Sequence, residues 1–171
     1  MKDIFGNDMI CDNNGAEFSP CGKYRYQLWR IWDEALPTIA FIGLNPSTAN
    51  ADKNDPTIRI IISVSKQLGY GGVFMYNLFS IISSKPEILL SNEDLQKNNQ
   101  WYLDEILTQC KDVCFAWGSF KQIGNRANEI VTLFDNALCL GKTKSGAPLH
   151  PLALMYNGTQ NNPKLIKYKN E

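Results

Sequence analysis

Short apolar segments alternate along the chain with segments whose apolar residues recur at helical spacing. The segment 24–32 has a strand-like composition with partial alternation, and 38–44 is a continuous apolar run of the kind found in strands buried on both faces. Further apolar strands are predicted over 73–79, 113–117 and 137–140. The last four of these segments form the predicted central sheet.

Helical patterns separate those four strands. Asp55 is a favourable N-cap and Pro56 suits the first helical position, so a helix is predicted to begin there and to end at the glycines that follow Leu68. Two further helices are predicted over 91–107 and 125–134. The alternation predicts an α/β protein, specifically a three-layer α/β/α fold around a central, mostly parallel four-stranded sheet.

The two ends of the chain are polar. Residues 1–22 contain turn-forming pairs and predict an irregular N-terminal arm or a loose hairpin. The polar, mildly basic tail 157–171 is expected to fray. A length of 171 residues suits one domain and is short for two, so a single domain over 1–171 is predicted.

The charge balance narrows the classes of function. The chain has 17 Lys plus Arg and 17 Asp plus Glu, so its formal net charge is zero. A strongly basic protein held on nucleic acid by bulk charge is therefore excluded. Contact with DNA through a local patch, or a site for a small molecule, remains open.

Cysteine and histidine content argues against a metal. Five cysteines are an odd number, which disfavours a complete disulfide framework, and His150 is the only histidine. We therefore expect no metal and no cofactor. The N-terminus lacks the apolar core of a signal peptide and no run of 18 apolar residues occurs, so a cytoplasmic protein without a membrane partner is expected.

Candidate chemistry follows the predicted strands. The first central strand leads into Gly43, Leu44, Asn45, Pro46 and Ser47. The carboxyl ends of parallel strands are where ligands bind in such sheets. The glycine permits close approach of a ligand, and the proline stiffens the turn, so the Asn45 amide would orient a water molecule or a ligand carbonyl. The alternative is that Asn45 only stabilises the turn.

Other strand ends carry further candidates. Asn77 is a lone amide in an apolar strand, suited to recognising the edge of a pyrimidine or to satisfying a neighbouring loop. Phe79 and Trp117 would stack on a base or belong to the core. His150 lies in a proline-flanked loop after the last strand. Just before it, the loop 142–145 offers Lys142, Lys144 and two hydroxyls for a phosphate, or is solvated surface.

Two aspartates precede the first predicted helix. Asp55 is explained by its place as the helix cap. Asp52 is a weak candidate for an acid or base.

These motifs resemble the uracil-DNA glycosylase superfamily. Gly-Leu-Asn-Pro-Ser at 43–47 is similar to the first motif of its mismatch-specific branch, with Ser47 in place of a glycine. Asn77 matches the strand asparagine that recognises the pyrimidine, and Trp117 with the glycine after it matches a further strand end. His150-Pro151 is similar to the start of the second motif, with Leu152 in place of serine. The whole chain looks more closely like a family of small bacterial and phage proteins known only as a domain of unknown function.

The resemblance implies roles for these residues. Asn45 would position water, Asn77 would recognise the base, Phe79 or Trp117 would stack on it, and His150 would donate a hydrogen bond to the base oxygen. The most active glycosylases have an aspartate where this chain has Asn45. Because an amide is a poor base, slow or absent hydrolysis is expected.

Three functions follow from the sequence. The first is a nucleobase pocket that hydrolyses an N-glycosidic bond. The second is a non-catalytic module that binds a nucleotide or nucleotide-like small molecule, such as a phage counter-defence protein that sequesters a nucleotide signal. The third is an interaction domain that retains an inactive pocket.

Overall fold

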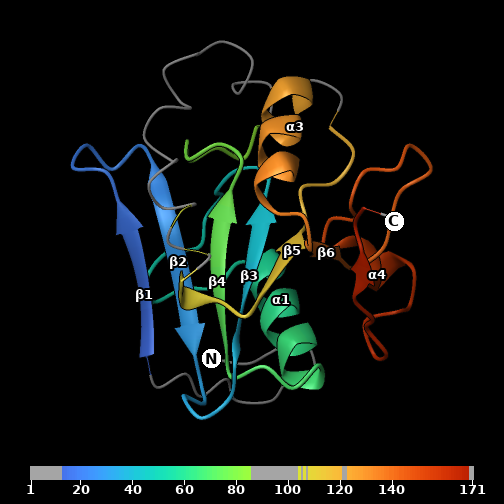
Figure 1. The fold of residues 1–171 in the computed structure, drawn as a ribbon. Helices are drawn as coiled ribbons and strands as arrows, with labels where there is room; N and C mark the ends of the chain where they lie inside the picture. The colour runs from blue at the N-terminus through green and yellow to red at the C-terminus, as the bar shows by residue number, and fades with distance from the viewer. Residues whose placement is uncertain (1–12, 86–103, 105, 107, 121–122, 170–171) are drawn as a thin grey trace.

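A computed structural model of the chain describes residues 13–85, 104, 106, 108–120 and 123–169 (Figure 1). These residues form one seven-stranded sheet with the strand order β1-β2-β4-β3-β5-β6-β7. The strands are β1 (Asn13–Phe18), β2 (Arg25–Ile31), β3 (Thr38–Gly43), β4 (Gly72–Asn77), β5 (Asp112–Phe115), β6 (Leu138–Cys139) and β7 (Ile166–Lys167). The helices of the described residues are α1 (Pro56–Gln67), α3 (Gly124–Leu133) and α4 (Ala153–Tyr156).

The predicted fold class is wrong. The sheet is mixed and seven-stranded, with antiparallel pairing of β1 with β2, β2 with β4, and β6 with β7, alongside parallel pairing of β3 with β4, β3 with β5, and β5 with β6. The described helices are short, and α4 has only four residues. A central, mostly parallel four-stranded sheet within three layers does not describe this arrangement. The error arose because the prediction left β1, β2 and β7 out of the sheet.

Both polar ends of the chain contribute edge strands. Residues 13–18 form β1, whose side chains are mostly exposed and which pairs antiparallel with β2, so of the two alternatives the irregular arm is wrong for this part of the chain. Within the tail predicted to fray, β7 pairs with β6. An edge strand is held by backbone hydrogen bonds to its one neighbour and needs no apolar run. Hydrophobic periodicity therefore gave no indication of either strand.

The inner elements agree with the apolar pattern. β2, β3 and β6 lie within the segments predicted as strands, β4 and β5 each begin one residue before and end two residues before the predicted bounds, and α3 lies close to 125–134. The Asp55 cap is confirmed: its Oδ1 accepts a hydrogen bond of 2.9 Å from the Ile58 amide, and Pro56 is the first residue of α1. The helix predicted over 91–107 lies almost entirely outside the described residues.

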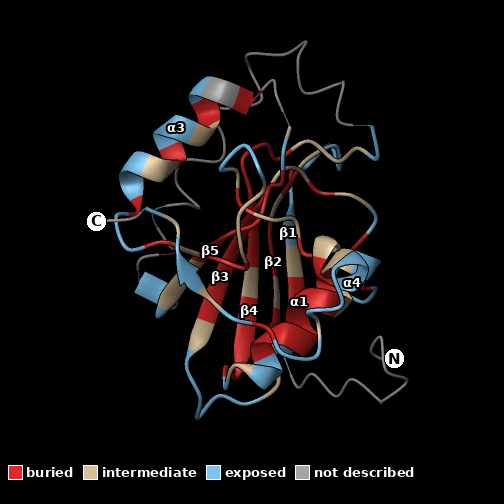
Figure 2. Cartoon of the chain, turned by 90° about the vertical axis from the view of Figure 1, so that its right-hand side faces the viewer, coloured by how far each residue is buried: buried red, intermediate tan, exposed pale blue. Residues whose placement is uncertain are grey.

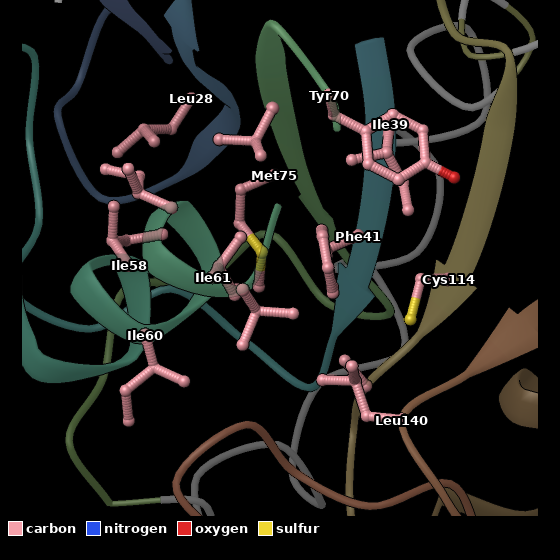
Figure 3. Close-up of a cluster of buried hydrophobic side chains, with 14 of the residues drawn as sticks. Leu28, Ile39, Phe41, Ile58, Ile60, Ile61, Tyr70, Met75, Cys114 and Leu140 are labelled. Atoms are coloured by element: carbon pink, nitrogen blue, oxygen red, sulfur yellow. The ribbon is translucent and has the colours of Figure 1, made fainter. Parts of the chain in front are cut away.

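Alternate residues of β3 enter two hydrophobic clusters on opposite faces of the sheet. Figure 2 shows the largely buried central strands between α1 and α3. Ile39 and Phe41 pack with the isoleucines of α1, as Figure 3 shows, and are fully buried. Ala40 and Ile42 belong to the second cluster, to which α3 contributes. Both faces of the central strands are therefore covered, and the loops that follow their carboxyl ends begin at a closely packed core.

Candidate functional site

A cavity of about 400 Å³ lies at the carboxyl ends of the parallel strands β3 and β4. Trp117, which follows the end of β5, also lines it. The predicted site residues that line it are Gly43, Leu44, Asn45, Ser47, Asn77, Trp117 and His150. Pro46, Phe79, Lys142 and Lys144 are not among the described residues that line it. The structure therefore brings one residue or more from each of four predicted strand ends to one place.

Asn45 joins two loops at the cavity. Its Nδ2 donates to the Ser83 carbonyl at 2.7 Å and to the Pro46 carbonyl at 3.0 Å. The Ser83 amide donates in turn to the Pro46 carbonyl at 3.0 Å. These bonds fix the side chain and use the amide hydrogens, which leaves the Oδ1 acceptor of Asn45 for a water molecule or a ligand donor.

Gly43 and Asn77 are paired across β3 and β4. Asn77 is 1% exposed and lines the cavity. A Cβ atom at position 43 would lie 3.0 Å from Asn77 Oδ1 and 2.5 Å from Met75 Cε. A side chain at position 43 would therefore crowd the Asn77 amide, so the glycine helps to set the position of that amide.

Trp117 and Phe79 have different surroundings. Trp117 is 3% exposed, lines the cavity, and packs against Phe115 with ring centroids 4.6 Å apart. Phe79 is buried in the second hydrophobic cluster, and its amide donates to the Leu44 carbonyl at 3.0 Å. Both aromatic candidates belong to the second hydrophobic cluster, and of the two only Trp117 is among the described residues that line the cavity.

His150 is half-buried against the end of β5. Gly118 has φ +77°, and a Cβ atom there would lie 3.3 Å from His150 Cβ, so this glycine permits the contact. Burial lowers the pKa of His150, and the negative charge of Asp55 partly opposes this effect. The Leu152 amide donates to His150 Nδ1 at 3.3 Å. The neutral ring therefore carries its proton on Nε2, which is free to act as a donor.

Lysines predicted to bind phosphate lie elsewhere. Lys142 Nζ is 5.7 Å from the centre of the Tyr168 ring, and Lys144 is exposed in the turn that follows. Lys142 also pairs with Pro148 in an isolated bridge. The loop 142–145 therefore forms its own turn beside β7 and does not line the cavity.

Sequence reasoning missed several lining residues. Arg25 enters from β2, Asp55 and Thr57 from the start of α1, and Ser83 and Ser84 from the loop after β4. Asp55 was assigned only to the helix cap, a role it fills with Oδ1 while also lining the cavity. The sequence offered one indication that Arg25 has a role: it is a charged residue within a predicted strand that is otherwise largely apolar.

Metal and membrane features are absent from the part of the chain that the structure describes. No group of three or more His, Cys, Asp or Glu side chains there is placed to hold a metal ion. Cys21, Cys110, Cys114 and Cys139 are free thiols. None of the described helices has the length and apolarity needed to cross a bilayer.

The fold and the site define a mixed-sheet protein with a cavity where its parallel strands end, lined by apolar side chains and by a few polar groups. A family model described as "Protein of unknown function (DUF1643)" matches residues 25–152, and the chain belongs to this family. No curated protein and no solved structure matches the chain. The family match carries no link to uracil-DNA glycosylases, so the resemblance of 43–47 to their motif stays a prediction.

Proposed function

We propose that the cavity binds a nucleotide-like small molecule, with the base against Asn77 and Trp117. One observation carries the proposal: a single cavity of about 400 Å³ brings together an amide at the end of β4, an indole ring just after β5 and an imidazole from the loop after β6. This volume falls within the range of small-molecule sites, roughly 300–1,000 Å³. The chemistry of these groups matches the edge and the face of a nucleobase.

Each group supplies a different contact. The Asn77 amide offers one acceptor and two donors, the pattern that pairs with the edge of a base. Trp117 supplies an aromatic ring for stacking or edge contact. The Nε2 proton of neutral His150 is suited to a carbonyl oxygen of the base, since Nδ1 already accepts from Leu152.

Binding without turnover is favoured over hydrolysis. The Asn45 amide hydrogens are held by carbonyls, and an amide does not remove a proton from water. One oxygen of Asp55 is occupied by the cap of α1. The zero net charge supports a free small molecule rather than a long duplex as the ligand.

Hydrolysis of an N-glycosidic bond is the second candidate. The observation in its favour is that Asp55 and His150 line the same cavity, so a carboxylate absent from the 43–47 motif is present nearby. In that reaction water attacks the sugar carbon, the bond to the base breaks, and the base leaves with a proton. Chromatography of nucleotides and uracil-containing oligonucleotides after incubation would detect the released base. Absence of free base from all of them would exclude this candidate.

Calorimetric titration of the protein with nucleobases, nucleosides and nucleotides tests the binding proposal. We expect saturable binding by wild type, at least tenfold weaker binding by Asn77→Ala, and unchanged binding by Asn136→Ala, an exposed matched control. A tenfold loss corresponds to about 1.4 kcal/mol, within reach of one or two hydrogen bonds. Failure of folded wild type to bind any of these compounds, or equal affinity of Asn77→Ala, would overturn the proposal.

A further inference from the structure

Arg25 reaches the cavity from a strand that runs against the parallel ones. It is the first residue of β2, which pairs antiparallel with β4, and its amide donates to the Ser80 carbonyl at 2.9 Å. The amino end of β2 therefore lies beside the carboxyl end of β4. The side chain is 2% exposed and lines the cavity next to residues from β3 and β4.

The guanidinium of Arg25 is incompletely satisfied. Nη1 donates to the Ala49 carbonyl at 2.8 Å, but the buried Nε makes no hydrogen bond within the described part of the chain. Arg25 also forms no salt bridge with any described carboxylate. A guanidinium has five N–H donors, so most of its bonding capacity is unused.

Arg30, on the same strand, shows what a structural arginine looks like in this fold. It is 1% exposed, and its Nε, Nη1 and Nη2 all donate to protein oxygens. These acceptors lie on Gly15, Trp29, Asn50 and Asn54, at 2.6–3.2 Å. Arg30 thus holds the loop before α1, whereas Arg25 is equally buried without comparable partners.

Arg25 is cationic at physiological pH. Burial lowers its pKa to about 10, with the neighbouring Asp55 opposing and Arg30 reinforcing that change. Asp55 lines the same cavity but forms no salt bridge with Arg25, and its Oδ1 is engaged by the Ile58 amide. A buried charge without a close partner is unfavourable unless a ligand supplies one.

We propose that Arg25 binds a phosphate group of the ligand, so that the cavity has an anion subsite next to its base subsite. The planar guanidinium matches two phosphate oxygens, and the hydroxyls of Ser47, Thr57 and Ser83 line the same cavity. The identity of the anion as a nucleotide phosphate rests on the proposed function, whereas the subsite itself rests on Arg25 alone. Phosphate binding is thereby assigned to β2 instead of the 142–145 loop.

The decisive measurement is the affinity of uridine and of uridine 5′-monophosphate for four proteins. These are wild type, Arg25→Gln, Arg25→Lys and Arg59→Gln, the last a matched control because Arg59 lies on α1 and is not among the described lining residues. We expect wild type and Arg59→Gln to bind the monophosphate at least tenfold more tightly than the nucleoside. That preference should fall below twofold in Arg25→Gln. It should be intermediate in Arg25→Lys, which keeps the positive charge but loses the planar guanidinium group.

Inorganic phosphate separates the two proposals. Millimolar binding of phosphate that Arg25→Gln abolishes, without binding of any nucleoside or nucleotide, supports the anion subsite and overturns the nucleotide proposal. Equal affinity of wild type for uridine and its monophosphate overturns the anion subsite and leaves base binding intact. Binding of inorganic phosphate by Arg25→Gln with the affinity of wild type also overturns the anion subsite.

Thermal unfolding in phosphate-free buffer distinguishes a ligand-binding arginine from a structural one. Arg25→Gln removes a poorly paired buried charge, so its melting temperature should equal or exceed that of wild type. A melting temperature several degrees lower would assign Arg25 a structural role and contradict the proposal. Asp55→Asn, which keeps an oxygen for the cap but removes the negative charge, should bind phosphate more tightly than wild type.

Discussion

Gly43→Ala is the substitution that tests the cavity without removing any polar side chain. The added methyl group would lie 2.5 Å from Met75 Cε and 3.0 Å from Asn77 Oδ1. The end of the Met75 side chain is flexible and can turn away. The Asn77 amide is buried, with 1% of its surface exposed, and the approach of the methyl group to Oδ1 requires it to shift by a few tenths of an ångström.

The two effects of this methyl group differ in size. Overpacking lowers the free energy of unfolding by roughly 1–3 kcal/mol. The lower conformational entropy of the unfolded chain with alanine raises it by about 0.4–1 kcal/mol. The net loss of about 1–2 kcal/mol lowers the melting temperature of a chain this long by roughly 2–8 °C. Displacement of Asn77 from its partner on the ligand should weaken binding at least tenfold, or by about 1.4 kcal/mol.

Gly72→Ala provides the matched control at the other end of β4. A Cβ atom there would lie 3.1 Å from Ile31 Cγ1 and from Thr38 Cγ2, so similar overpacking is expected far from the lining residues. Differential scanning fluorimetry and nucleotide titration of both variants then separate stability from recognition. If Gly43→Ala folds and binds nucleotides as wild type does, Asn77 does not recognise the ligand. Equal loss of binding in Gly72→Ala would show that reduced stability is responsible.

Two further predictions follow from the titratable groups. Burial lowers the pKa of His150 below its usual 6.5, so below about that pH the unfolded chain binds more protons and stability falls as the pH drops. Urea unfolding between pH 5 and 8 should show a shallower pH dependence for His150→Gln, and identical slopes would refute this. Hydrogen bonding to Ser19 lowers the pKa of exposed Cys21, whereas burial raises that of Cys114. Peptide mass spectrometry after native iodoacetamide treatment should find Cys21 modified, and modification of Cys114 without denaturant would contradict the packed core.

The inner part of the fold is predictable because its residues carry strong local preferences. The apolar run of β3 is buried on both faces, and the Asp55-Pro56 pair begins α1 as expected. Strand order is different, because it depends on long-range backbone pairing. Nothing in the polar sequence of β1 indicates that it pairs with β2, and the two-residue β7 is too short to give a pattern.

The candidate site was predictable only in part, for a related reason. Gly43, Asn77 and Trp117 all follow or end parallel strands, so their convergence follows from strand direction. Arg25 arrives at the same place through antiparallel pairing, which sequence periodicity does not reveal. Phe79 has an aromatic side chain that suits a core as well as a ligand, and here its surroundings are the second hydrophobic cluster.

The antiparallel placement of β2 separates two determinants of specificity. Under the proposed functions, the shape and edge of the base are recognised by residues at the ends of β3, β4 and β5, while the charge of the ligand is recognised from the start of β2. Position 25 lies at the end of its strand, outside both hydrophobic clusters. Family members that differ at this position would therefore exchange anionic for neutral ligands while keeping the same base pocket and the same core.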